Sequence, residues 1–379
     1  MKSKINLIVR SILLGAASGM IVWTFLKILA VCTEFIWETF PNQLQNPFYT
    51  VAVCTAGGLI TGIYRKKFGD YPEEMMVVLG KVKKQKWYDY KKLPVILPAA
   101  FLPLVFASSV GPEAGLVGII TALCYWVADS LKNYANRGKA EEDKKALGKA
   151  TKSVTYGFAI AAGLTCYVVL NKLLGAAMAG FPSFEAALPS GKDMLMAIVY
   201  IIVGCLLAKY YEITHHGSHV AADKVPPVAR ETAAGLCLGI VATFVPQIMF
   251  SGEEEIHHLM TEFVDYLPWM LLGIALLKIL MTNICIQCGL KGGHFFPLIY
   301  AGVAAGYAIA MFLFSENAAE HVVFAAAVVT SAMLGANMKK PWIVILLLLI
   351  CFPVRMVFWL AIGAFSGSSI MSLGGNKNE

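Results

Sequence analysis

Long apolar segments recur along the whole chain, and they constrain its fold more than any other feature. Several are long enough for the roughly 20 residues that a helix needs to cross a bilayer. Only 15% of the 379 residues are charged, against about 25% in soluble domains. We therefore expect an all-α polytopic protein, embedded in the cell (plasma or inner) membrane. The segments lie at about 6–31, 48–64, 93–131, 154–175, 194–208, 233–250, 267–288, 294–314, 322–338 and 341–365.

The distribution of basic residues indicates which loops are cytoplasmic. The first apolar segment follows Lys2, Lys4 and Arg10 and is too long for the apolar region of about 7–15 residues in a signal peptide, so we expect a retained helix. Further Lys and Arg gather in short loops within 65–92 and 132–149, as the positive-inside rule predicts for cytoplasmic loops. The net charge of +7 therefore gives no support to nucleic-acid binding.

The segment 93–131 lies between two basic loops and must enter and leave the membrane on one side. Its 39 residues suffice for two helical legs, with a turn near ASSVGPE at 107–113. Pro112 suits the start of the second leg, which places Glu113 in its first turn. A helix N-terminus binds anions, so Glu113 is either a tethered anion that competes with a free one or a simple cap at the outer surface.

Two further stretches predict helices that begin inside the membrane. GLKGGHFFPLI at 289–299 joins two apolar segments, and FGDYPEE at 68–74 precedes an apolar piece too short to span. Irregular backbone at membrane depth is tolerated where it lines a cavity or is buried in protein, and paired interrupted segments indicate a transport site. We expect these helix starts to converge on an anion site made of backbone amides.

The ordered set GDYPEE, GPEAG and GGHFFP resembles the CLC family of chloride channels and anion/proton exchangers, whose patterns are GSGIP, G(K/R)EGP and GxFxP. GGHFFP fits fully, GPEAG keeps Gly111 and Glu113, and Gly69 stands where the family has an anion-contacting Ser. The resemblance implies two inverted, interlocked halves at about 8–180 and 190–372, in a homodimer with one pore per protomer. It also implies membrane lipids as surroundings, and no cofactor.

By that resemblance Glu113 is the gating and proton-carrying glutamate. The resemblance also assigns backbone anion sites to Pro112, Glu113, Ala114, His294, Phe295 and Phe296, and path candidates to Gly69, Lys278 and Met371. Lys278 either adds positive potential to the path or extends to an interface. Met371, with Ser372 next, is the nearest match to the family's pore-closing Tyr.

Departures from the family leave the mechanism open. Many exchangers have a second acid near the cytoplasmic face, where this chain has Asn171 and Lys172. Chloride is the expected anion and a fluoride-selective exchanger the alternative; channel and proton-coupled exchanger both remain. The chain ends at 379 without paired nucleotide-binding modules, so we expect no nucleotide regulation. An intramembrane enzyme is the competing class, but the histidines of ITHHGSH at 213–219, expected in a polar loop, form no H-E-x-x-H motif.

Overall fold

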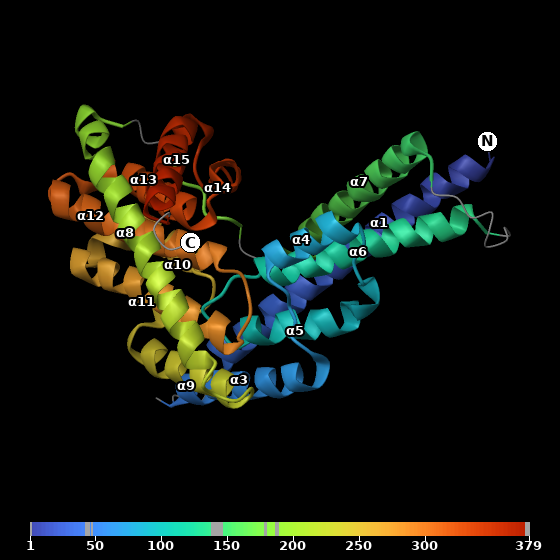
Figure 1. Cartoon of the computed structure of the whole chain (residues 1–379), viewed down its shortest axis with the longest axis horizontal. Helices are drawn as coiled ribbons and strands as arrows, with labels where there is room; N and C mark the ends of the chain where they lie inside the picture. The colour runs from blue at the N-terminus through green and yellow to red at the C-terminus, as the bar shows by residue number, and fades with distance from the viewer. Residues whose placement is uncertain are drawn as a thin grey trace. The chain divides into compact units, whose positions relative to one another are not determined.

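The computed structural model describes residues 2–41, 46, 48–137, 147–177, 180–185 and 189–375. Within these residues the regular structure is helical apart from one isolated β-bridge. Eight of the helices are long and apolar enough to cross a membrane, which confirms the predicted all-α polytopic fold. The chain forms two compact units, which are described in turn (Figure 1).

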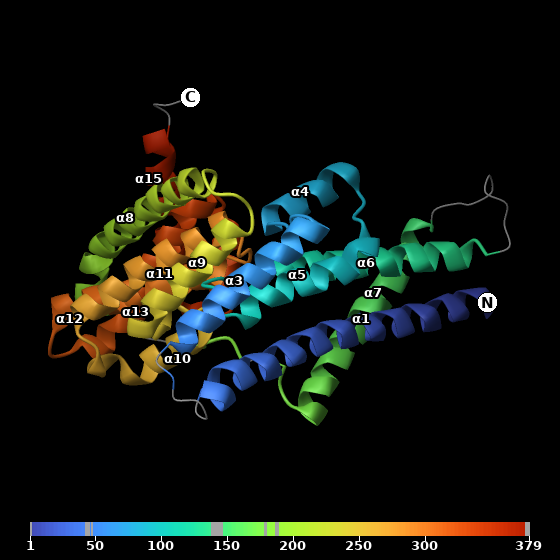
Figure 2. The same ribbon diagram turned by 90° about the horizontal axis from the view of Figure 1, so that it is seen from below.

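Unit 1 comprises Met1–Asn46, Lys67–Val105 and Pro112–Ala179. Its central contact joins α1 and α7, which cross in Figure 2. A Cβ added to Gly15 would lie 2.0 Å from the carbonyl oxygen of Ala159, and one on Gly19 would lie 2.2 Å from that of Gly163. Glycine is therefore what allows the two backbones to meet. The helices of unit 1 are α1 (Lys2–Glu34), α4 (Met75–Gln85), α5 (Leu93–Val105), α6 (Glu113–Ala135) and α7 (Lys149–Leu174), with η1 (Phe35–Thr39) and η2 (Tyr90–Lys92).

Unit 2 comprises Pro47–Lys66, Phe106–Gly111 and Gly180–Glu379. Its core is built around α13, which packs against α8, α12 and α15. The small side chains of Ala325, Ala326 and Ala327 are fully buried there. The helices are α3 (Tyr49–Phe68, its last residues in unit 1), α8 (Gly191–Ala222), α9 (Ala229–Phe244), α10 (Glu253–Glu262), α11 (Pro268–Cys288), α12 (Phe295–Phe314), α13 (Ala318–Met338), α14 (Pro341–Leu348) and α15 (Val357–Gly375), with η4 (Pro246–Ile248), η5 (Phe263–Asp265) and η6 (Val354–Met356).

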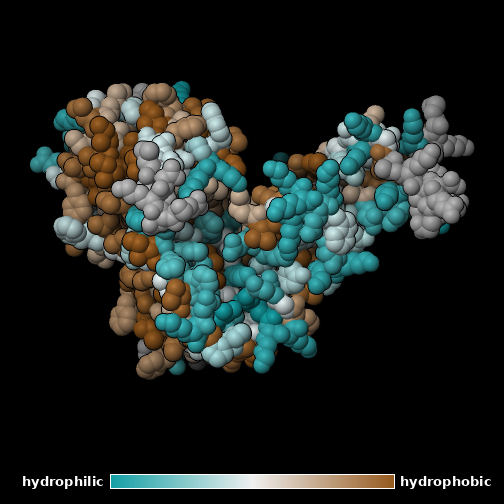
Figure 3. All heavy atoms as spheres, viewed as in Figure 1, coloured by the Kyte–Doolittle hydropathy of each residue, from teal (hydrophilic) through white to brown (hydrophobic). Residues whose placement is uncertain are grey.

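The outer surface of unit 2 is apolar. Large apolar side chains such as Leu195, Ile198 and Leu206 of α8 are exposed, and brown spheres cover much of this unit in Figure 3. Such an exposed surface is unusual for a soluble protein. It is the surface that a lipid environment requires.

The segment boundaries were partly predicted. The stretch 93–131 forms two helices with a turn between Val105 and Glu113, as predicted. The histidine-rich stretch at 213–219, expected in a loop, instead continues α8 through Gly217, because polar side chains do not by themselves end a helix and an isolated glycine within one is tolerated. The apolar segment 341–365 is split between α14 and α15, with Pro353 at the N-cap of η6 in the connection.

The close contact between α8 and α13 gives a test of packing. A Cβ on Gly204 would lie 2.6 Å from the carbonyl oxygen of Val329, whereas one on Gly217 of the same helix would meet nothing within 4 Å. We expect Gly204→Ala to destabilise the protein by about 1–3 kcal/mol through overpacking. Gly217→Ala should be neutral or stabilising by up to about 1 kcal/mol. Thermal unfolding in detergent measures both, and equal melting temperatures would contradict the packing described.

Candidate functional site

Two loops of unit 2 pair through their backbones. The Gly111 N–H donates to the Gly293 carbonyl at 2.7 Å, and the Gly293 N–H donates to the Gly111 carbonyl at 2.6 Å. Both glycines are buried. Irregular backbone in a membrane protein must satisfy its own polar groups, and this reciprocal pair does so for the two interrupted segments that the sequence singled out.

A helix begins just after each paired glycine. Glu113 is the first residue of α6, with Pro112 at its N-cap, and Phe295 is the first residue of α12, with His294 at its N-cap. The first bonds of the two ladders are donated by Leu116 and Leu298, so the preceding amides lie at the helix N-termini. The predicted break points are therefore confirmed.

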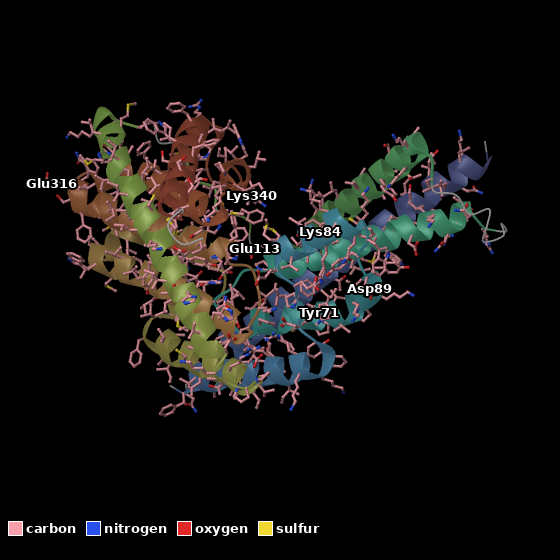
Figure 4. The ribbon with its side chains drawn as sticks, in the orientation of Figure 1. Tyr71, Lys84, Asp89, Glu113, Glu316 and Lys340 are labelled. Carbon is pink, nitrogen blue, oxygen red and sulfur yellow. The ribbon has the colours of Figure 1, made fainter. Side chains whose placement is uncertain are left out.

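The predicted anion-binding backbone needs one revision. Pro112 has no N–H and cannot donate a hydrogen bond; its φ of −74° instead directs the chain into α6. Glu113 and Ala114 carry the first amides of α6, and Phe295 and Phe296 those of α12. The Glu113 side chain is half-buried at the start of α6 (Figure 4).

The loop before Gly111 is held by contacts within unit 2. The Phe250 N–H donates to the Ala107 carbonyl at 3.2 Å, and the buried hydroxyls of Ser109 and Thr282 lie 3.3 Å apart. Ala107 has a φ of +56°, a conformation that is uncommon for a residue other than glycine. The loop is thus fixed at both its start and its centre before the chain reaches Gly111.

Lys278 of α11 holds the segment 247–250, whose last residue, Phe250, bonds to the loop before Gly111. Its side chain is fully buried, and its ammonium group donates to the carbonyl oxygens of Met249 at 2.7 Å and Phe250 at 2.9 Å, with those of Ile248 and Gln247 at 3.2 and 3.4 Å. The ammonium also lies 5.4 Å from the centre of the Tyr300 ring. Because Lys278 is completely buried, its side chain does not extend to the membrane–water interface, which was one of the two predicted roles.

Hydrogen bonds link Lys278 to the start of the loop that precedes Gly111. Lys278 fixes the carbonyl of Phe250, whose N–H in turn holds Ala107. Burial raises the pKa of Glu255 in the neighbouring helix α10, while the positive charge of Lys278 acts in the opposite direction. An unpaired charge buried here would be very costly. The backbone carbonyls that bind the Lys278 ammonium offset this cost and are themselves held in place by it.

A second buried charge anchors the loop before Gly293. The Arg65 guanidinium of α3 donates to Glu231 Oε1 of α9 at 2.6 Å and to the Gly289 carbonyl at 2.9 Å, and both side chains are buried. Glu231 Oε2 accepts from the Val228 N–H at 2.6 Å. Gly289 follows the last residue of α11 and has a φ of +104°. Because Arg65 binds the Gly289 carbonyl, it fixes the point where α11 ends and the glycine-rich loop begins.

The other path candidates lie in a turn and on the last helix. Gly69 is exposed with a φ of +101° in the turn before α4. Met371 of α15 packs against the core of unit 2, and the Ser372 hydroxyl donates to the Ser369 carbonyl of its own helix. In unit 1, Asn171 accepts from the Trp23 indole at 2.8 Å and from the Ala177 N–H at 3.2 Å.

Sequence reasoning missed the polar residues that hold the two loops. Ser109, Thr282, Arg65 and Glu231 lie within or beside apolar segments, and all four are buried. The available signal was that a polar side chain in an apolar helix must find a partner. The described residues include no group of three or more His, Cys, Asp and Glu that could hold a metal ion.

The class of protein follows from these features: a polytopic membrane protein whose broken helices begin at a shared backbone pair. Residues 145–372 match the family model described as voltage gated chloride channel. This match covers more than half of the chain, so the chain belongs to the voltage-gated chloride channel family, also called CLC, and is a multi-pass integral membrane protein of anion transport.

Individual relatives agree with the family. YfeO of Escherichia fergusonii, which bears an ion-transport name, is 24% identical over 338 residues, covering 78% of this chain and 77% of the relative; YfeO of Escherichia coli strain SMS-3-5 is also 24% identical. A slow cyanobacterial Cl−/H+ antiporter has a similar structure, with a TM-score of 0.75 and 16% identity. A CLC-type fluoride/proton antiporter gives 0.63 and 16%. Both alignments cover 97% of this chain and 95% of the other.

The support from Lys278 predicts a large effect of removing its charge. In Lys278→Met the carbonyls of Met249 and Phe250 lose a buried donor, and each unsatisfied group costs about 1–3 kcal/mol. We expect a loss of at least about 3 kcal/mol in stability, together with reduced but not abolished anion flux. Lys209→Met removes an exposed ion pair with Glu212, worth about 0–1 kcal/mol. Similar melting temperatures and fluxes for the two variants would contradict the supporting role.

Proposed function

We propose that this protein moves a halide, first of all chloride, through a path lined by backbone amides and gated by Glu113. One observation supports the proposal most strongly: the hydrogen-bonded pair of Gly111 and Gly293 joins the segments that lead into α6 and α12. Anion transport, with no catalysed bond change, is the function proposed.

Neutral amides suit a permeant anion better than a buried cation does. An anion that leaves water needs donors, and the first amides of a helix supply them together with about half a positive charge. We assign this role to the amides of Glu113 and Ala114 in α6 and of His294, Phe295 and Phe296 in α12. A full charge such as that of Lys278 would hold the anion too tightly for fast release, and Lys278 is engaged by carbonyl groups.

Glu113 competes with the anion in this proposal. Its carboxylate is covalently attached to the first turn of α6, so at high pH it occupies donors that the anion would otherwise use. Protonation removes the negative charge and releases those donors. Anion flux is therefore expected to rise as pH falls, and the same carboxyl can carry a proton.

The proposed mechanism includes at most weak coupling of anion flux to protons. Asn171 stands where many exchangers of the family have a second acid, and its amide cannot carry a proton as a carboxyl does. We propose uncoupled or weakly coupled flux, with full exchange as the alternative. Fluoride is the alternative anion, because Gly69 supplies no hydroxyl where chloride-transporting members have Ser.

We also propose that the chain works as a homodimer with one path per protomer, in which residues 8–180 and 190–372 form inverted halves. This proposal rests on the family pattern. The mass of the detergent-solubilised protein tests it, and a monomer that transports fully would contradict it.

Paired flux measurements test the function. Liposomes containing the purified protein are loaded with chloride or, in parallel, with fluoride, and anion and proton movements are recorded together. We expect chloride efflux that requires a potassium shunt and moves few or no protons. Proton uptake driven uphill by the outward anion gradient would instead establish an exchanger. No flux of either anion, with protein-free liposomes as the baseline, would contradict the proposal.

Glu113→Gln tests the gate itself. The neutral amide can neither compete as an anion nor titrate, so chloride flux should no longer depend on pH. Its rate should equal or exceed that of the wild type at low pH, and any proton movement should stop. Glu320→Gln is the matched control, because Glu320 also lies in the first turn of a helix but is exposed; its pH profile should equal that of the wild type. An unchanged pH profile in Glu113→Gln would remove Glu113 from the mechanism.

A further inference from the structure

Unit 1 contains an apolar cavity that the transport proposal does not use. The cavity has a volume of about 320 Å3 and is lined by one face each of α1, α6 and α7, within residues 15–22, 120–127 and 156–167. The hydroxyl of Ser18 is turned away from any ligand by its bond to the Leu14 carbonyl at 2.9 Å. The cavity therefore offers carbon surface with almost no polar group to satisfy.

The shape of the cavity follows from the sizes of its lining residues. At its back, Gly15 and Gly19 of α1 meet Ala159 and Gly163 of α7 at backbone distance. At its rim the side chains of Cys124, Ile160 and Leu164 are exposed. All three helices are candidate membrane spans, and exposed apolar side chains on such helices suit contact with the hydrocarbon of the bilayer. A rise of 1.5 Å per residue over 156–167 makes the groove roughly 16 Å long.

Basic residues gather at one end of the three helices. The start of α1, the end of α6 and the start of α7 meet there, since Leu7, Leu131 and Ala159 belong to one buried cluster, and Figures 1 and 2 both show this end. The Arg10 guanidinium lies 4.6 Å from the centre of the Tyr134 ring. The Lys152 ammonium lies 5.5 Å from that of Tyr156, and Tyr156 lines the cavity.

Among the residues that the structure describes at this end, the exposed charges are mainly positive. Lys132 near the end of α6 and Lys149 and Lys152 in the first turn of α7 are exposed, as is Arg10 of α1. Among the described residues of this end, the carboxylate of Asp129 is engaged by the Tyr90 hydroxyl at 2.8 Å and the Asn133 amide at 3.4 Å. An anionic group near the cavity mouth would thus be within reach of several flexible, positively charged side chains.

We propose that this groove binds an anionic phospholipid, with an acyl chain in the cavity and the phosphate at Arg10, Lys132 and Lys152. The apolar lining matches hydrocarbon, and basic residues near the membrane surface attract anionic headgroups with about 1 kcal/mol each. A second copy of the chain is the poorer occupant. In a two-fold interface the same patch faces itself, which would place these cations against one another.

Native mass spectrometry of the whole purified protein tests the site. The protein is incubated with phosphatidylglycerol or with phosphatidylcholine of the same acyl chains, and bound lipid is counted. We expect the wild type to retain phosphatidylglycerol at least fivefold more than phosphatidylcholine. Cys124→Phe should fill the groove and reduce phosphatidylglycerol binding at least fivefold, and Lys152→Gln should lower the preference between the two lipids.

Matched variants keep the test decisive. Val169→Phe adds the same side chain at an exposed position of α7 outside the groove and should bind lipid like the wild type; Leu164→Trp replaces Cys124→Phe if that variant does not fold. Equal binding of both lipids by the wild type would overturn the headgroup assignment. Equal losses in Cys124→Phe and Val169→Phe, or a change of oligomeric state in Cys124→Phe alone, would overturn the lipid site, the latter in favour of a second copy.

Discussion

The reciprocal hydrogen bonds between Gly111 and Gly293 are the constraint on which the rest of the site depends. A chain that interrupts its helices inside a membrane must pair the exposed backbone groups or lose several kcal/mol for each. Here the two interruptions satisfy each other. Small residues make the approach possible: a Cβ on neighbouring Gly292 would lie 2.4 Å from a methyl carbon of Val110. The glycines therefore serve the close contact as much as the turn.

The buried charges of unit 2 support this pair without entering it. Lys278 binds the carbonyl of Phe250, whose N–H bonds to Ala107 in the loop before Gly111, and Arg65 binds the Gly289 carbonyl at the start of the other loop. Both cations bind main-chain oxygens, whose positions are set by the fold. Full charges behind the backbone pair hold it in place, while the groups that we propose to face an anion can remain neutral amides.

Much of the site could be predicted, because its break points are local. Gly and Pro mark where helices start, so the positions of Glu113 and Phe295 followed from a few neighbouring residues. The supports are different: Lys278 binds carbonyls about 30 residues earlier, and Arg65 meets Glu231 166 residues away. No spacing rule in one sequence gives such partners. The extension of α8 through its histidines shows the limit of polarity as a signal, because polar residues occur both in loops and in exposed turns of a helix.

Gating and proton coupling make different demands on this structure. The proposed gating by Glu113 needs one titratable group at the start of α6, since in that proposal a single proton removes its competition with the anion. Coupling needs in addition a route for that proton to the other side of the membrane. At the position where the family resemblance leads us to expect a second acid, the Asn171 oxygen accepts hydrogen bonds from the Trp23 indole and the Ala177 amide, next to the end of α7. We infer that pH sensitivity is built into the helix start, whereas coupling would require groups elsewhere, so the two properties should separate in flux measurements.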